Sequence, residues 1–317
     1  MLKFIVRRSL LSILILLLAV GLLFFMIHMV PGDPSSVILG PKASPELKAE
    51  LNARMGLDKP ILVQLGNFYS GLARGDMGID VFSERQVADV VFEQLPYTLA
   101  LVFAAIGGAA LLGIPLGCFS AIRRNSILDR LTAVMSVAFI AIPSFVVALY
   151  LLLWLAVSWR WFPAMGAGAD GDIADQLRHL VLPATALGLG WVGYIARLVR
   201  ASMLEVMEEN HIRTARAFGL PERTIIVHYA LRIAILPTVT ILGLGIGTML
   251  SGALFAEIVF SRPGIGKLLH EAVVTRNYPV VMGSVLVTTA FFVLSTLVSD
   301  IINAALDPRL REGGKSS

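Results

Sequence analysis

Six long runs without a charged residue constrain this chain more than any other feature of its sequence. Each run holds 18 to 29 residues and no Asp, Glu, Lys or Arg; the runs are 9–32, 94–122, 131–159, 179–196, 233–256 and 277–299. About 20 apolar residues cross a bilayer as one helix. The sequence therefore predicts an all-α integral membrane protein with six transmembrane helices.

The composition agrees with a membrane protein and narrows its chemistry. Only 15% of the residues are charged and 56% are hydrophobic, whereas soluble domains carry about 25% charged residues. The single cysteine, Cys118, excludes a disulfide within the chain and a thiolate metal cage. The five histidines show no metal-ligand spacing, and no catalytic triad or carboxylate pair stands out. We therefore predict no catalytic residue, no metal site and no cofactor in this chain.

Basic residues predict the orientation of the helices. If the N-terminus is cytoplasmic, 15 Lys and Arg residues lie in cytoplasmic segments and only 5 in the short outer loops. Cytoplasmic loops are enriched in Lys and Arg, and long loops such as 33–93 are exempt from this rule. We therefore expect both termini in the cytoplasm.

The predicted order is a tail with helix one (1–32), an outer region (33–93), a five-helix core (94–306) and a cytoplasmic tail (307–317). The start resembles a signal peptide, but the apolar run is long and lacks an Ala-x-Ala-like cleavage site. We therefore interpret it as an uncleaved first helix rather than a removed signal.

Residues 33–93 lie between the first two runs and contain their own helix signals. These signals predict three helices, from Ser44-Pro45-Glu46 to Gly56, from Pro60 to Gly75-Asp76-Met77-Gly78, and after the capping box Ser83-x-x-Gln86. Three capped helices favour a small extracytoplasmic helical region that acts as a lid or docking surface. The alternative is a loop that only connects the first two transmembrane helices.

Two short glycine-lysine sequences resemble phosphate-binding loops without completing one. In Gly264-Ile265-Gly266-Lys267, Ser261 takes the place of the required glycine and Leu268 the place of the hydroxyl residue. In Gly313-Gly314-Lys315-Ser316, Arg309 takes the place of that glycine. We therefore expect that this chain does not hydrolyse ATP by itself.

The most polar stretch of the core is the segment 197–235, which we call the coupling segment. The fourth transmembrane helix is expected to continue into it as far as Met207, because Met203 and Met207 share one apolar face. Glu208-Glu209-Asn210 then interrupts the pattern. The segment is mostly basic, so it presents a charged surface between two apolar helices.

A short helix and a corner follow within the coupling segment. The pattern predicts a helix from His211 to Phe218, with Ile212 and Ala215 on one side and two arginines on the other. Gly219 is the left-handed residue that ends such a helix. Pro221 then begins another helix, Pro221–Arg232, which leads into the fifth transmembrane helix.

Three interpretations of this short helix compete. It can lie on the anionic membrane surface as an amphipathic helix, or it can dock a partner protein. A DNA-binding helix-turn-helix is suggested by Ala217-Phe218-Gly219-Leu220, but two flanking transmembrane helices leave it no room to enter a major groove. Nucleic acid is therefore not an expected partner.

The coupling segment resembles the EAA loop of binding-protein-dependent ABC importer permeases. Its form, Arg213-Thr214-Ala215-Arg216-Ala217-x-Gly219-Leu220 followed by His228-Tyr229-Ala230-Leu231-Arg232, is similar to the variant of the dipeptide, oligopeptide and nickel permease subfamily. Further matches run through the chain: Pro31-Gly32-Asp33-Pro34, Gly56-Leu57-Asp58-x-Pro60, Gly75-Asp76-x-Gly78, Pro263-Gly264-Ile265-Gly266, Asn277-Tyr278-Pro279-Val280 and Asp307-Pro308-Arg309. One departure is Asn277, where the subfamily usually has Asp.

The resemblance implies a permease subunit of the bacterial inner membrane that works with other proteins. A second homologous permease chain, two ATPase subunits that bind ATP and Mg²⁺, and an extracytoplasmic solute-binding protein are the implied partners, beside membrane lipid. The short helix would be the coupling helix seated on an ATPase subunit. The implied ATPase-coupling residues are Ile212, Arg213, Thr214, Ala215, Arg216, Ala217, Gly219 and Leu220.

The solute is less well specified by the sequence. The resemblance implies short peptides, while nickel chelates and glutathione-like molecules are alternatives carried by similar permeases. A different class, an ion-coupled secondary transporter or channel, would need buried charges near the middle of the membrane. The charge-free centres of all six runs argue against that class.

Overall fold

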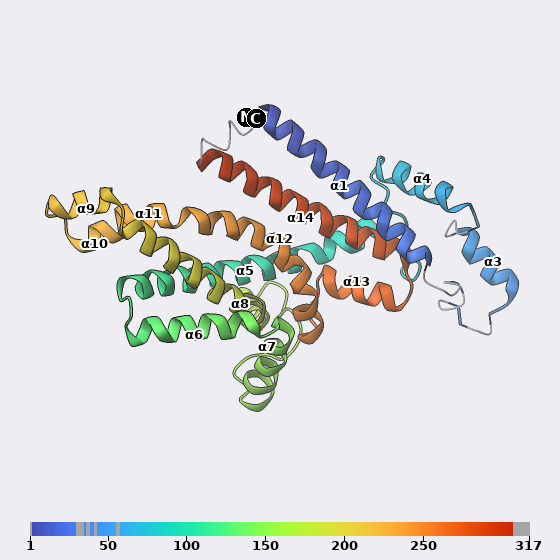
Figure 1. Cartoon of the computed structure of the whole chain (residues 1–317). Coiled ribbons are helices and arrows are strands. Elements are labelled where there is room, and N and C mark those ends of the chain that lie inside the picture. The colour runs from blue at the N-terminus through green and yellow to red at the C-terminus, as the bar shows by residue number, and fades with distance from the viewer. Residues whose placement is uncertain (1, 30–34, 36–38, 41–42, 55–57, 307–317) are drawn as a thin grey trace. The chain divides into compact units, whose positions relative to one another are not determined.

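The computed structural model describes residues 2–29, 35, 39–40, 43–54 and 58–306 and is helical throughout (Figure 1). Among these residues the only β pairing is an isolated bridge between Ile79 and Gln86. The predictions at Pro31-Gly32-Asp33-Pro34, at Gly56 and in the tail 307–317 lie outside the described residues. The all-α fold class is confirmed.

The chain forms two compact units, which we treat separately. The core unit contains Leu99–Arg262 and the stretch from Ser295 onward, and the N-terminal unit contains Leu2–Thr98 and Pro263–Leu294. The helices in chain order are α1 (Leu2–Met29), α3 (Pro45–Arg54), α4 (Ile61–Leu72), α5 (Val87–Ile122), α6 (Ile127–Ala141), α7 (Ser144–Leu151), the π-helix η1 (Leu152–Ser158), α8 (Ile173–Met207), α9 (Asn210–Ala217), α10 (Glu222–Thr224), the π-helix η2 (Ile225–Ala230), α11 (Leu231–Ala234), α12 (Leu236–Val259), α13 (Ile265–Val274) and α14 (Tyr278–Leu306).

Five of the described helices are long and apolar enough to cross a membrane, and a bent pair brings the total to six if it counts as one span. The five are α1, α5, α8, α12 and α14. The predicted third span, 131–159, is instead divided into α6 and α7–η1, which meet at an angle of 99°. Pro143 causes this break, because it has no N–H to donate and it forces Ile142 into an extended conformation (φ −83°, ψ 122°).

Helix α8 is the centre of the core unit, and small residues let α5 and α6 approach it closely. A Cβ atom at Gly117 of α5 would lie 2.5 Å from the carbonyl oxygen of Ala196 in α8. A Cβ atom at Gly193 of α8 would lie 2.6 Å from the carbonyl oxygen of Ser136 in α6. Figure 1 shows α6 beside α8, and α7 leaves the line of α6 while its Ala148 still packs against Leu182 and Ala186 of α8. Close packing of α5, α6 and α8 therefore depends on these glycines.

The N-terminal unit is built on α1, α4 and α14. Val20 and Phe24 of α1 are buried against Met282 and Leu286 of α14, and side chains of α4 cover the same cluster. The Tyr69 hydroxyl of α4 donates a hydrogen bond to the carbonyl oxygen of Leu17 at 2.7 Å. Apolar contacts and this hydrogen bond hold α4 on the first membrane helix.

The region 33–93 follows the sequence prediction in part. Helix α3 begins at Pro45 after Ser44, whose hydroxyl accepts a bond from the Leu47 N–H, and α4 begins after Pro60. The prediction of a separate third helix is wrong. Ser83 is not its N-cap, because the helix begins only at Val87 as the first turn of α5, and the Ser83 hydroxyl donates to Asp80 instead.

Candidate functional site

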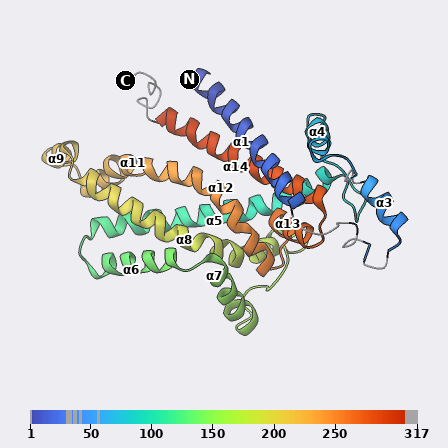
Figure 2. The same cartoon turned by 45° about the vertical axis from the view of Figure 1, so that its right-hand side comes forward.

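The coupling segment folds as a long helix, a short helix, a corner and a second helical stretch. Helix α8 ends at Met207, as predicted, and α9 occupies Asn210–Ala217, one residue before the predicted 211–218 at each end. Met203 is fully buried in the apolar cluster of this part of the core unit. Figure 2 shows α9 at the end of α8, near α11, and Figure 1 also labels the short α10 there.

One face of α9 is packed into the core unit. Ile212 has no exposed surface and Ala215 is buried, and both join a cluster with Ile225 and Ala230 of the following helical stretch. Burying one such aliphatic side chain contributes about 1.5–3 kcal/mol. Two of the eight predicted site residues therefore hold the helix in place rather than forming its free surface.

The opposite face of α9 is exposed. Arg213, Thr214, Arg216 and Ala217 lie on it, and Phe218 directly after the helix has 81% of its surface exposed. Among the described residues, no side chain forms a hydrogen bond or ion pair with Arg213. An exposed cation and, five residues later, an exposed aromatic ring form a surface suited to a protein partner, because Arg and aromatic residues dominate binding hot spots.

Arg216 differs from Arg213, because it already has a partner in this chain. Its Nε donates to Glu222 Oε1 at 2.7 Å, and both side chains are partly exposed. The Arg216 side chain therefore connects α9 to α10, and its role toward an ATPase subunit stays a prediction. His211 at the start of α9 similarly lies 2.9 Å from Glu209.

The corner after α9 is a Schellman motif centred on Gly219. The Gly219 N–H donates to Arg216 O at 2.9 Å, and the Leu220 N–H donates to Ala215 O at 3.3 Å. Gly219 has φ +76°, a conformation that glycine adopts without steric cost. The predicted left-handed stop is confirmed.

The helix predicted over Pro221–Arg232 is not a uniform α-helix. Pro221 precedes α10, which is followed by the π-helix η2 and then by α11. The wider π turns leave His228 and Tyr229 exposed while Ile225 and Ala230 stay buried. Sequence periodicity alone does not distinguish such a π stretch from an α-helix.

A buried polar cluster near the same end of the core unit was missed by sequence reasoning. The Asp129 side chain is 5% exposed and accepts hydrogen bonds from Arg200 of α8, Ser120 of α5 and the Asn125 N–H. Asp129 is the only acidic residue in the basic segment 123–130. That isolated charge was the available signal for a buried ion pair.

A cavity of about 500 Å³ lies in the core unit where α6 breaks into α7. Helices α8 and α12 complete its walls, and its polar groups are the side chains of Ser144, Trp191, Tyr194 and Thr248. None of the described residues that line it is Asp, Glu, Lys, Arg or His. The cavity is therefore an uncharged space beside a broken membrane helix, which is the kind of place where membrane proteins form pathways.

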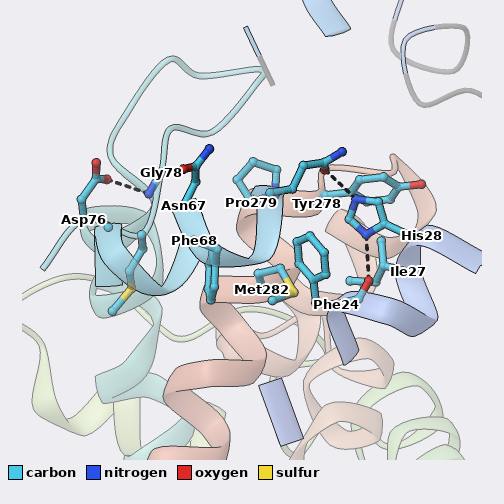
Figure 3. Close-up of a pocket in the computed structure, with 13 residues that line it drawn as sticks. Phe24, Ile27, His28, Asn67, Phe68, Asp76, Gly78, Tyr278, Pro279 and Met282 are labelled. Atoms are coloured by element: carbon cyan, nitrogen blue, oxygen red, sulfur yellow. Dashed lines mark hydrogen bonds between the residues drawn. The ribbon is translucent and has the colours of Figure 1, made fainter. Parts of the chain in front are cut away.

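A second cavity, of about 240 Å³, lies in the N-terminal unit between α1, α4 and the start of α14 (Figure 3). Phe24, Phe68 and Met282 give it an apolar floor, and Asn67 and Asp76 contribute polar groups. His28 bonds through Nδ1 to the Phe24 carbonyl at 2.8 Å and through Nε2 to Gln64 Oε1 at 3.0 Å. The cavity has the size of a single large side chain.

These features define a class: a multi-pass helical membrane protein with a broken span, an uncharged cavity beside it and a polar helix presented at one end of its core. Residues 113–312 match the family "Binding-protein-dependent transport system inner membrane component", and residues 1–102 match its N-terminal counterpart. The chain belongs to this family. It is a permease subunit of a binding-protein-dependent ABC importer.

Two curated relatives are similar over almost their whole length. The glutathione transport system permease protein GsiC of Shigella flexneri is 35% identical, with 98% of this chain and 99% of the relative covered. The dipeptide transport system permease protein DppB of Escherichia coli is 36% identical over the same shares. In fold, the inward-facing MetNI methionine ABC transporter matches with a TM-score of 0.57 and 20% identity, over 69% of this chain and 96% of that one.

Proposed function

We propose that this chain is the membrane pathway of an importer for short peptides or a similar small solute such as glutathione or a nickel chelate. ATP and Mg²⁺ are bound by separate ATPase subunits. The observation that carries the proposal is the construction of α9: Ile212 fixes the helix to the core unit while Arg213 and Phe218 face outward. A helix anchored on one face and exposed on the other can receive a force and pass it on.

The finer assembly is a pair of permease chains with two ATPase subunits, embedded in lipid, with both termini in the cytoplasm. Seating α9 on an ATPase subunit fits the exposed guanidinium of Arg213, which can form a bidentate bond with an acidic group. Exposed apolar side chains of α7 and η1, such as Phe145, Leu149 and Leu153, are suited to a second permease chain or to lipid.

The extracytoplasmic region 33–93 is proposed to dock the solute-binding protein. The cavity in Figure 3 supports this, because it is too small for a peptide but fits one side chain. An apolar cavity of about 150 Å³ is sufficient to bind benzene. An aromatic or large aliphatic side chain of the binding protein is therefore the proposed occupant.

The solute class is supported by the relatives and by the core cavity. The named relatives are a glutathione permease and a dipeptide permease. The described walls of the core cavity contain no charged side chain and so do not prefer solutes of one charge sign over the other, which suits peptides of varied side chains. Selection would then rest with the binding protein.

Reconstitution tests the proposal. Proteoliposomes are prepared with the complete complex, with the ATPase side accessible to ATP, and labelled peptides are presented on the binding protein. Uptake is expected only with ATP and binding protein, and none by this chain alone. Ion-driven uptake by the chain alone would establish the alternative class, a secondary transporter. The ligand that copurifies with the binding protein identifies the solute.

A further inference from the structure

The buried carboxylate of Asp129 is held by four donors from three parts of the core unit. Arg200 Nε and Nη2 donate to its two oxygens at 2.5 and 2.9 Å. The Ser120 hydroxyl donates at 2.5 Å and the Asn125 N–H at 2.9 Å. A carboxylate has about four acceptor positions, so this one is saturated. The cluster joins the end of α5, the start of α6 and the last third of α8.

The ion pair also sets the register of α6 on α8. Asp129 lies opposite Arg200, Ser136 opposite Gly193, and Phe139 opposite Gly190. Each step forward along α6 is matched by an equal step backward along α8, as in one straight antiparallel pair. At Gly193 the α6 backbone is so close that a Cβ atom would lie 2.6 Å from it.

Stability alone does not account for such a pair. The Asp129 side chain is 5% exposed and the Arg200 side chain 30%. Replacing a buried ion pair by apolar residues of similar size is often neutral or stabilising, whereas a fixed register is the best supported role of buried polar groups. If α6 slid along α8 by one turn, about 5.4 Å, Asp129 would leave the Arg200 guanidinium and remain buried without its counter-charge. The pair therefore opposes sliding more than it adds to packing.

The position of the pair connects α9 to the core cavity. Arg200 precedes the end of α8 by seven residues, about 10 Å along the helix axis, and α9 begins three residues after that end. At the other end of α6, Phe139 lines the cavity. Helix α6 thus extends from the ion pair to the wall of the proposed pathway.

We propose that Asp129 and Arg200 are positioning residues for transport, which make α6 move together with α8. Displacement of α9 by the ATPase would then reach the cavity wall at Phe139 through α6 as well as through α8. This inference rests on the function proposed above. The competing explanation is that the pair serves only folding and assembly.

The chain offers a matched control for the test. Arg124 and Glu208 join the same two segments by an exposed ion pair of 3.5 Å, and exposed pairs contribute little. The complete complex is reconstituted with Asp129→Leu/Arg200→Met, with Asp129→Asn, or with the control Arg124→Gln/Glu208→Gln. Solute accumulated per ATP hydrolysed is measured for each.

The Asp129→Leu/Arg200→Met complex is expected to assemble and hydrolyse ATP while the ratio of solute to ATP falls by about tenfold, within the usual range of coupling between sites. The control complex should keep the wild-type ratio. Asp129→Asn, which preserves the shape of the side chain, should also lower the ratio, and it decides the question if the double variant does not assemble. An unchanged ratio in the variants that assemble overturns the inference.

A distance measurement separates positioning from folding. Spin labels are placed at Met135 of α6 and Arg197 of α8, both exposed, in a Cys118→Ser background. In the wild-type complex their separation should be the same without and with ATP, and in the double variant it should change. A constant separation in both complexes contradicts the inference. If the wild-type complex shows no ATP-driven uptake, the proposed function fails instead.

Discussion

Asn277, the residue before α14, donates a hydrogen bond through its amide nitrogen to Asp80 Oδ1 at 2.5 Å. Both residues are buried in the N-terminal unit. Burial raises the pKa of the Asp80 carboxyl, but bonds from the Ser83 hydroxyl, the Phe82 N–H and Asn277 outweigh it and keep the pKa below its usual value. The neutral amide at position 277 therefore complements a charged carboxylate at position 80.

This arrangement predicts that acidification lowers the stability of the wild-type protein and raises the stability of the Asn277→Asp variant. Because the folded-state pKa of Asp80 is lowered, its contribution to stability is present above the unfolded pKa of about 3.9 and is lost as the pH falls through the folded value. Asn277→Asp places a second carboxylate against the first, and two such groups cannot both ionise cheaply. The variant should lose about 1–3 kcal/mol near pH 7.5 and recover part of it on acidification to about pH 5.

Thermal unfolding of the detergent-solubilised wild type and variant, measured at both pH values, checks the prediction. Asn277→Ala is the matched control, since it removes the hydrogen bond without adding a charge and should lower the melting temperature equally at both pH values. Equal stability of Asn277→Asp and wild type at pH 7.5 would contradict the assignment of Asp80 as the charged partner.

Gly219 is predicted to be required for its backbone conformation rather than for space. A Cβ atom there would meet nothing within 4 Å, but φ is +76°. A β-branched residue in this region costs about 1–2 kcal/mol or more, whereas Asn adopts it more easily. Gly219→Val should abolish solute uptake with normal membrane insertion, and Gly219→Asn should retain most of it. Equal uptake by the two variants would mean that the corner plays no part in coupling.

Substitutions on the two faces of α9 are predicted to affect different properties of the protein. Ile212→Ala removes a fully buried side chain and should destabilise the core unit by about 2–5 kcal/mol. Arg213→Ala lies on the exposed face and should leave thermal stability unchanged while weakening copurification of the ATPase subunits. The comparison needs both measurements on both variants; a loss of stability in Arg213→Ala would place that side chain in the packing instead.

Alanine substitutions at two glycines of α5 are predicted to have different effects on stability. In α5, a Cβ atom at Gly117 would lie 2.5 Å from the Ala196 carbonyl oxygen, whereas one at Gly107 would meet nothing within 4 Å. Gly117→Ala should therefore cost about 1–3 kcal/mol through overpacking. Gly107→Ala should be neutral or slightly stabilising, because alanine favours the helix. Thermal stability in detergent gives the result, and similar values for both variants would refute the proposed α5–α8 contact.

Much of this fold could be predicted because membrane helices and helix ends depend on local sequence. The end of α8 at Met207, the start of α4 after Pro60 and the stop at Gly219 all follow from nearby residues. The bend at Pro143 could be suspected from the proline, but its angle depends on packing against α8 and α12.

The parts that could not be predicted depend on contacts between distant residues. Asp129 and Arg200 are 71 residues apart and Asp80 and Asn277 are 197 apart, so no periodicity relates them. The ion pair between Arg216 and Glu222 could not be predicted from the sequence, and Phe218 stood inside the motif without a predicted role. Local sequence patterns predict where helices begin and end, whereas ion pairs between different helices can be identified only once the fold is known.

The central claim is that the exposed face of α9 receives an ATPase subunit. A photo-crosslinking amino acid at Phe218, next to α9, tests it in the assembled complex. The same group at Trp161, in the loop at the other end of α8, is the control; both positions are exposed, at 81% and 61%. The account predicts a crosslink to the ATPase subunit from position 218 and none from position 161. An ATPase crosslink from position 161 with none from position 218 would contradict it.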